Sequence, residues 1–114
     1  MTTLTQEKLN SIISEAKTAA HQAAKTYFEE KLGNVDQYAC GFAWVNIYEV
    51  KGNTKLGRML KAAGISQDHT KAFQIWNPSG FHCQNVDTLE AGAVAAAKVL
   101  RDHGFIAYAG SRLD

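Results

Sequence analysis

The chain has 114 residues, a formal net charge of +1 at pH 7 and 46% hydrophobic residues, which suits one domain over 1–114 with a single core. The balanced charge gives no reason to expect nucleic-acid or membrane binding, and no apolar run reaches the roughly 20 residues of a transmembrane helix. Two cysteines are too few for a disulfide scaffold and the N-terminus has no signal-peptide pattern, so a cytoplasmic protein with free thiols is expected.

A long amphipathic helix is predicted for 1–34. Apolar residues recur along it at steps of three and four, which makes one continuous stripe. Thr3 or Thr5 can cap its start, and Gly33 with Asn34 is a usual helix end. At about 1.5 Å per residue this helix is roughly 40 Å long, more than one small sheet covers. The excess predicts a homo-oligomer, formed through the helix or through an aromatic sheet face.

Tyr38–Val50 is the strongest predicted strand, and it opens an α/β core over 38–114. Apolar residues on both of its faces indicate a central strand that is covered on both sides. One face is small and aliphatic, whereas the other carries bulkier residues: Cys40, Phe42, Trp44, Asn46 and Tyr48. The bulky face has two interpretations, a core under the first helix or a platform on which bases stack, as in sheet-based RNA binders. Burial under the helix is favoured.

A turn and a short helix follow, at Lys51–Asn53 and Thr54–Ala63, with Asn53 as the predicted N-cap. A glycine-containing turn that opens a helix presents free N–H groups at the positive end of the helix dipole. Lys55 and Arg58 add positive charge, so this segment is a candidate anion site. It lacks the full G-x-x-x-x-G-K-[ST] pattern of a P-loop, and an ordinary capped, solvated helix explains it more simply.

A hairpin that leads into a helix is predicted next. Ala72–Trp76 and Phe81–Val86 are the strands, joined by a type I turn at Asn77–Gly80. Asp87 is predicted to cap the following helix, with Glu90 closing a capping box. The second strand is polar for a sheet interior, so a loop is the alternative there.

Thr88–His103 is predicted as an alanine-rich helix that ends at Gly104, and Phe105–Leu113 as the last strand. The predicted class is α+β, a long N-terminal helix followed by a βαββαβ (ferredoxin-like) layer of sheet and helices. If Phe81–Val86 is a loop, three strands and three helices remain in a smaller α/β sandwich.

Polar and aromatic residues gather near the predicted strand ends, where ligand sites collect in α/β folds. Arg112 provides a planar fork for phosphate or carboxylate, although an ion pair with Asp87 or Asp114 is the simpler use. The predicted ligand-binding residues combine this group with the two cations of the short helix: Trp76, Asn77, Gln84, Asn85, Arg112, Lys55 and Arg58.

No catalytic residue, metal site or cofactor is predicted. His82 and Cys83, with Asp87 nearby, suggest a thiol nucleophile and its base, but neighbouring strand residues point to opposite faces. The possible zinc ligands lack C-x-x-C or H-x-x-x-H spacing: His69, His82, Cys83 and His103. A binding protein is therefore favoured over an enzyme.

Four blocks of the sequence carry a resemblance: GFAWVNI at Gly41–Ile47, IWNPS at Ile75–Ser79, EAG at Glu90–Gly92 and SRLD at Ser111–Asp114. Together they resemble a family of small tailed-bacteriophage proteins, over roughly the last two-thirds of the chain. That family has no established activity, so no catalytic role is carried over. The resemblance implies a phage accessory protein in the host bacterial cytoplasm.

Two functions of the binding class follow as expectations. In the first, the protein is a non-enzymatic host-defence antagonist that binds or sequesters a nucleotide-like or phosphorylated ligand. In the second, it inhibits a host defence or regulatory protein by occupying its surface, without a small ligand. A concave site with an aromatic ring and convergent polar groups favours the first function, and a flat apolar patch favours the second. Neither a membrane nor a nucleic acid is expected as a partner.

Overall fold

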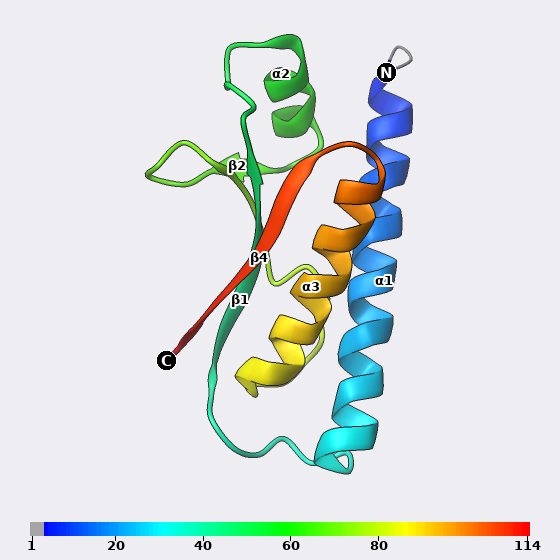
Figure 1. The fold of residues 1–114 in the computed structure, drawn as a ribbon, viewed down its shortest axis with the longest axis vertical. Coiled ribbons are helices and arrows are strands. Elements are labelled where there is room, and N and C mark those ends of the chain that lie inside the picture. The colour runs from blue at the N-terminus through cyan, green and yellow to red at the C-terminus, as the bar shows by residue number, and fades with distance from the viewer. Residues whose placement is uncertain (1–3) are drawn as a thin grey trace.

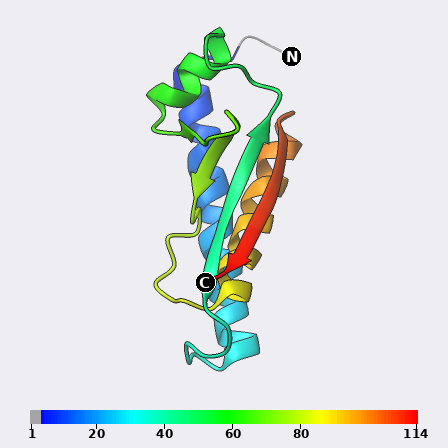
Figure 2. The same cartoon turned by 90° about the vertical axis from the view of Figure 1, so that its left-hand side faces the viewer.

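A computed structural model describes residues 4–114. Helices α1 and α3 lie side by side on one face of a four-stranded sheet (Figures 1 and 2). The elements follow one another as α1 (Gln6–Leu32), β1 (Gly41–Tyr48), α2 (Lys55–Ala62), β2 (Ser66–Gln67), β3 (Phe73–Trp76), α3 (Val86–Asp102) and β4 (Ile106–Leu113). The class is α+β with a long N-terminal helix, as predicted. None of the helices in residues 4–114 is long and apolar enough to cross a membrane.

The sheet has the strand order β2-β3-β1-β4, and each neighbouring pair is antiparallel. Strand β1 is therefore central, as its apolar composition predicted. It pairs along its full length with β4 and over residues 44–47 with β3, where Trp44 stands opposite Trp76. This register places the outward side chains of three strands next to one another.

The predicted hairpin is correct in its turn and wrong in its second strand. The N–H of Gly80 donates to the carbonyl oxygen of Asn77 at 3.1 Å, which closes the turn. Residues 81–85 instead run as a loop, with a single bridge between Cys40 and Asn85, and Val86 is already the first residue of α3. The fourth strand of the sheet is instead the two-residue β2, which the sequence did not reveal.

Tertiary contacts hold the segment between β3 and α3 in its loop conformation. The carboxylate of Asp36 accepts hydrogen bonds from the N–H groups of Gln84 and Asn85, at 2.9 and 3.1 Å. On the side of α1, Nδ1 of His21 lies 3.1 Å from the carbonyl oxygen of Ser79. These partners come from distant parts of the chain, so a local alternation pattern cannot anticipate them.

The long helix α1 packs along α3, and small residues permit their close approach. A Cβ on Gly92 of α3 would lie 3.0 Å from the backbone oxygen of Ala20 on α1. The apolar stripe of α1 is buried within one chain: Leu9, Ile12, Ile13, Ala16, Ala20, Ala24 and Leu32. A stripe too long for one chain was the reason to expect an oligomer. That reason no longer holds, and the oligomer stays a prediction.

Helix α2 lies at one end of the molecule, beside the start of α1 (Figure 1). The side-chain amide of Gln6 donates to the carbonyl oxygen of Met59 at 3.0 Å, which ties the two helices together. The layer over the sheet is thus formed by α1 and α3, although α2 is the helix that joins β1 to β2. A ferredoxin-like arrangement is therefore not established.

The first turns of α1 and α2 are each capped by a threonine side chain that accepts a backbone hydrogen bond. Thr5 caps α1, since its Oγ1 accepts from the backbone N–H three residues on at 3.1 Å. The alternative cap, Thr3, lies outside the described residues. Thr54 caps α2 by accepting from the N–H of Gly57 at 3.1 Å. The prediction that Asn53 is this cap is wrong by one residue.

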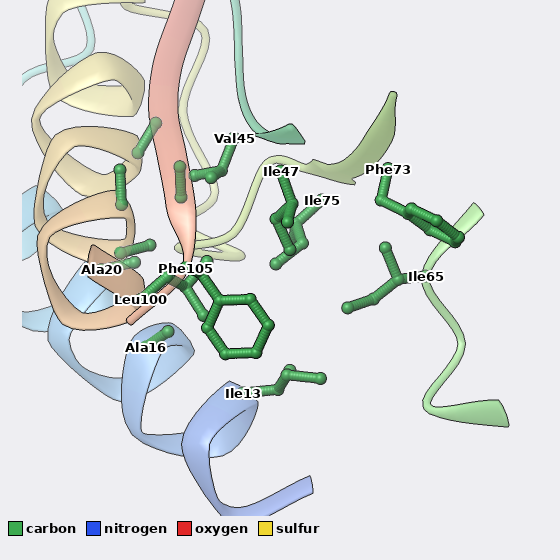
Figure 3. Packing of buried hydrophobic residues seen from close by; sticks show 14 of the residues in the cluster. Ile13, Ala16, Ala20, Val45, Ile47, Ile65, Phe73, Ile75, Leu100 and Phe105 are labelled. Atoms are coloured by element: carbon green, nitrogen blue, oxygen red, sulfur yellow. The ribbon is translucent and has the colours of Figure 1, made fainter. Parts of the chain in front are cut away.

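The core lies between the helix layer and the sheet and is mainly aliphatic (Figure 3). The small side chains of β1 face α3. Phe73 is the largest side chain that is fully buried. Buried residues that come from the strands are Ala43, Val45, Ile47, Phe73, Ile75 and Ala107.

The opposite face of the sheet has no helix on it within residues 4–114. Figure 2 shows the two main helices on the same side of β1 and β4. The interpretation of β1 as a strand covered on both faces is therefore wrong, and so is the burial of its aromatic face under the first helix. The bulky side chains that the sequence placed in a core lie on this uncovered side.

Candidate functional site

The uncovered side of the sheet carries five aromatic rings and is here called the outer face. Strand alternation and the antiparallel register determine which residues reach it. They are Phe42, Trp44, Asn46 and Tyr48 of β1, Gln74 and Trp76 of β3, and Ile106, Tyr108, Gly110 and Arg112 of β4. Several of the large ones are well exposed: Tyr48, Trp76, Ile106 and Tyr108.

Two tryptophans at the centre of the outer face are stacked. The rings of Trp44 and Trp76 are parallel to within 1°, with centroids 5.5 Å apart, which is an offset stack. Phe42 extends the group, its ring centroid 5.7 Å from that of Trp76. Because Trp76 is 51% exposed, part of its ring surface is open to a ligand.

Gly110 makes room for this stack. It stands opposite Trp44 on β4. A Cβ at this position would lie 2.5 Å from Nε1 of the Trp44 indole and 2.7 Å from its Cε2, so any side chain would displace the ring. The indole therefore lies across the bare backbone of Gly110, and its position is set by the sheet beneath it.

Two amide side chains lie beside the rings. Nε2 of Gln74 donates to Oδ1 of Asn46 at 3.3 Å, and Nδ2 of Asn46 donates to the hydroxyl oxygen of Tyr48 at 3.1 Å. The three side chains form a chain of hydrogen bonds across β3 and β1. This chain holds the amides in place and leaves further donor and acceptor positions free for a ligand.

Two arginines lie over aromatic rings on the β4 side of the face. The guanidinium carbon of Arg112 is 5.4 Å from the centroid of Phe42, and that of Arg101 is 5.0 Å from the centroid of Tyr108. Nη1 of Arg101 also donates to the carbonyl oxygen of Ala107 at 2.7 Å. Within residues 4–114 no ion pair joins Arg112 to an acidic group, so the expected pair with Asp87 or Asp114 is absent from the described chain.

A small pocket adjoins one end of the outer face. Its volume is about 230 Å³, below the roughly 300–1,000 Å³ of pockets that enclose small ligands. The lining includes three predicted site residues: Trp76, Asn77 and Gln84. Cys83 also lines it, and burial raises the pKa of its thiol, which therefore stays protonated and is a poor nucleophile.

Asn85 has a structural role. Its side chain is 1% exposed. Oδ1 accepts from the backbone N–H and the hydroxyl of Thr88, at 2.8 and 2.9 Å, and Nδ2 donates to the carbonyl oxygen of Gln37 at 2.9 Å. Asn85 is thus the N-cap of α3, and the prediction of Asp87 as the cap is wrong. Because its polar atoms are used within the chain, we leave Asn85 out of the candidate site.

Lys55 and Arg58 lie on α2, at the end of the molecule away from the C-terminal half of β4 (Figures 1 and 2). The structure does not bring them near Trp76 and Arg112. Nη1 of Arg58 donates to the carbonyl oxygen of Asn53 at 2.7 Å. The predicted ligand residues other than the buried Asn85 therefore divide into one group at the outer face and its adjoining pocket and another on α2.

A basic hollow beside α2 includes two lysines that the sequence did not single out. It has a volume of about 680 Å³ and lies among Lys51, Lys61 and Lys71. Asp68 also lines it, but its carboxylate is taken up by the turn, where it accepts from the N–H and the hydroxyl of Thr70 at 2.8 and 2.6 Å. The side-chain hydrogen bond from Thr70 is the largest factor that holds the pKa of Asp68 below its ordinary value.

Within residues 4–114 no group of three or more His, Cys, Asp or Glu side chains is placed to hold a metal ion. Of the histidines considered as ligands, His103 is 3.1 Å from Oε1 of Glu15 and His82 is exposed. The arrangement offers ring surfaces, amides and guanidinium groups, which bind ligands through stacking, hydrogen bonds and charge.

Sequence reasoning found Trp76 and Arg112 but assigned the rings of β1 to the core and passed over Tyr108 and Gly110. Two features of the sequence indicate that these residues lie on an open face. Asn46 is out of place on a helix-covered aromatic face. Alternation along the last strand also puts Tyr108 and Gly110 on the same side as Arg112.

Comparisons with protein-family models, with curated proteins and with solved structures give no match. They neither support nor oppose the resemblance to tailed-phage proteins. The function is therefore argued from the geometry of the outer face.

Proposed function

We propose that the protein is a non-enzymatic binding protein that takes a nucleotide-like ligand on its outer face. The observation that carries this proposal is the parallel stack of Trp44 and Trp76 on an uncovered sheet, with the guanidinium of Arg112 nearby. Base-on-ring stacking contributes about 1–3 kcal/mol per base. The planar fork of an arginine matches the oxygens of a phosphate. A base and its phosphate thus find complementary groups on one surface.

The rings of the outer face are held ready for a ligand. The indole of Trp44 lies on Gly110, and Trp76 is set by its stack on Trp44. A side chain that is already ordered loses less conformational entropy when a ligand binds, a saving of about 0.5–1.5 kcal/mol per side chain. Pre-ordered rings therefore favour binding.

The small pocket supports a binding role and no covalent step. Its thiol, Cys83, is protonated because burial raises its pKa. The side chains of Asn77 and Gln84 offer amide groups at the pocket wall. We propose that they contact the edge of a base stacked on Trp76.

The resemblance to tailed-phage proteins supplies the context of the proposal. In that context the protein would act in the host bacterial cytoplasm as a host-defence antagonist, by withholding a nucleotide-like ligand. The support for this part is the four sequence blocks. A ferredoxin-like relationship belongs to the same proposal, and its support is the strand order β2-β3-β1-β4.

A second candidate is a protein partner, either a host protein or a second copy. The observation in its favour is the exposed apolar surface at Trp76, Ile106 and Tyr108, which are 51%, 43% and 54% exposed. Exposed patches of this kind often mark protein interfaces, and Trp, Tyr and Arg dominate their binding energy.

The intrinsic tryptophan fluorescence of the protein tests the proposal. Titration with adenosine and uridine monophosphates should quench the emission, because a stacked base lies against the indoles. Trp76→Ala should remove most of the quenching and weaken binding. Tyr27→Ala, on α1 in the helix layer, is the matched control and should bind as the unaltered protein does. If no nucleotide quenches the emission and the protein forms dimers in sedimentation equilibrium, the second candidate replaces the first.

A further inference from the structure

We infer that the ligand of the outer face is a single-stranded nucleic acid, with two or three bases in contact, rather than a free nucleotide. This inference rests on the proposed function and names its ligand class. It departs from the expectation drawn from net charge, because the local chemistry of one surface decides binding here.

The outer face is longer than one nucleotide. Phe42 and Tyr48 are six residue steps apart on β1, which is about 20 Å at 3.3 Å per step. Within this length the rings lie in separate groups, with the Trp44–Trp76 stack in the middle and Tyr108 beside Asn46 one row further along. Sheet platforms that bind RNA stack two or three bases on rings arranged in this way.

The charges on the outer face favour a polyanion. Arg112 is the one residue of the face with a formal charge, and Arg101 reaches its edge at Tyr108. Both guanidinium groups lie on the β4 side, so a row of phosphates fits along the outer edge of β4 while the bases lie over the rings of β1 and β3 and over Tyr108. The face itself contributes no carboxylate.

The same charges disfavour a second copy as the occupant. If two outer faces packed together, the guanidinium groups of Arg112 and Arg101 from both copies would enter the interface. No carboxylate of the outer face would be there to pair with them. Burying charges without partners costs several kcal/mol per ion, whereas phosphates supply the missing partners.

The amides lie where bases would be read. Asn46 and Gln74 are in the register row next to the tryptophans, and Tyr108 ends that row on β4. Asn and Gln side chains hydrogen-bond the edges of unpaired bases, which are accessible only in single strands. A duplex hides these edges, so the inferred partner is single-stranded.

The adjoining pocket does not enclose a free nucleotide. At about 230 Å³ it is smaller than the pockets that bury most of a small ligand's surface. A mononucleotide would therefore rely on one stacked base and one phosphate on an open surface. A single strand adds further bases and phosphates on the same face, so its affinity should be much higher.

The test compares ligands that differ in length and strandedness, with one RNA and one DNA single strand. Fluorescence anisotropy of labelled decauridylate RNA and decathymidylate DNA gives the direct affinities, and competition with uridine monophosphate and a ten-base-pair duplex gives the others. We expect each decamer to bind at least tenfold more tightly than the monophosphate and the duplex. With two phosphates neutralised, the plot of log affinity against log salt should have a slope of about −1.4 for a single strand.

Variants locate the strand on the outer face. Trp76→Ala and Tyr108→Ala should each weaken decamer binding about 5- to 150-fold, as the loss of one stacked base does. Trp76→Phe keeps a ring and should retain most of the affinity, which controls for misfolding. Tyr27→Ala removes a ring from the helix layer and should bind normally.

The outcomes separate this inference from the proposed function. If the monophosphate binds as tightly as the decamers, the inference is wrong while the proposed function stands. If the duplex binds as tightly as the decamers, single-strand recognition is wrong. If neither monophosphates nor decamers bind, both proposals are wrong. Decamer binding that Trp76→Ala and Tyr108→Ala leave unchanged would place the ligand elsewhere and overturn the inference.

Discussion

The two faces of the sheet are built from the same strands with different residues. The face toward α1 and α3 is aliphatic and closely packed, with Val45, Ile47 and Phe73 almost fully buried. The outer face carries the aromatic rings, two amides and an arginine, and no helix of the described residues 4–114 covers it. Aliphatic side chains interdigitate well in a core, whereas rings with polar edges bind ligands on a surface.

This difference means that one face of the sheet carries the residues that stabilise the fold and the other face carries the residues that bind. Each β1 residue that points inward stabilises the fold, and each neighbour that points outward is available to a ligand. Changes on the inner face should therefore lower the free energy of unfolding strongly. Changes on the outer face should alter binding more than stability.

The largest expected effect comes from a matched pair of changes on β3. Phe73→Ala should lower the free energy of unfolding by about 3–5 kcal/mol, because it opens a cavity in the core. Trp76→Ala, three residues on and half exposed, should cost only about 1–2 kcal/mol from lost stacking and partial burial. Urea denaturation measures both. Equal losses would mean that the outer face is packed in solution.

The next largest effect concerns the start of α3. Asn85→Ala removes the N-cap and leaves the carbonyl of Gln37 without its donor, so it should cost about 2 kcal/mol. Asp87→Ala, in the exposed first turn, should cost less than about 1 kcal/mol from the helix dipole alone. Thermal melting of the two variants ranks them. The reverse order would restore Asp87 as the cap.

A smaller effect is expected from Gly110→Ala. The added Cβ displaces the Trp44 indole, so the variant should lose the tryptophan stack, worth about 0.5–1.5 kcal/mol. Near-ultraviolet circular dichroism should show the loss as a changed tryptophan signal, and nucleotide binding should weaken. An unchanged signal together with unchanged binding would mean that the stack is not set by Gly110.

Arg112→Lys should have almost no effect on stability. The cation over Phe42 is worth less than about 1 kcal/mol at an exposed site, and lysine keeps the charge. Binding should nevertheless weaken several-fold, because an ammonium cannot form the paired hydrogen bonds of a guanidinium with phosphate. Calorimetric titration with a nucleotide, next to a thermal melt, separates the two effects. Full affinity in both Arg112→Lys and Arg112→Ala would remove Arg112 from the site.

The smallest effect is a pH dependence at the edge of the sheet. The pKa of Asp68 is below its ordinary value, mainly because of the Thr70 hydroxyl. The ionised carboxylate of Asp68 therefore stabilises the turn between β2 and β3 at any pH above the unfolded-state pKa of about 3.9. This stabilisation is lost as the pH falls through the lower pKa that Asp68 has in the folded protein. The chemical shift of the Thr70 amide, followed by nuclear magnetic resonance, should change with pH as Asp68 is protonated. This pH dependence should disappear in Asp68→Asn. The outer-face signals should stay constant, since that face holds no carboxylate or histidine.

The sequence was sufficient for the elements whose signals are local. Periodicity, a cap residue and a left-handed glycine mark the start and end of α1, and all three lie within its own residues. The segment from Phe81 to Val86 was misassigned because its conformation depends on hydrogen bonds that its backbone N–H groups donate to Asp36, far away in the chain. Local sequence signals are therefore enough to predict a helix such as α1, but not the conformation of a loop that distant residues hold in place.

The candidate site was predictable only where its residues carry local sequence signals. Trp76 and Arg112 lie at strand ends, where a ligand site is a general expectation. Alternation separates the two faces of β1 but does not say which face the helices cover, because that choice depends on α1 packing against α3. Tyr108 and Gly110 become part of the site only through the register of β4 with β1.

The central claim is that the outer face is open in the free protein and is covered by the ligand. Hydroxyl-radical footprinting with mass spectrometry tests it directly, with Tyr27 on α1 as the internal reference. We expect Trp76 and Tyr108 to be oxidised readily in the free protein at every concentration, and decauridylate or decathymidylate to protect both without changing Tyr27. Protection of Trp76 and Tyr108 in the free protein, or oxidation that the decamers leave unchanged, would contradict it.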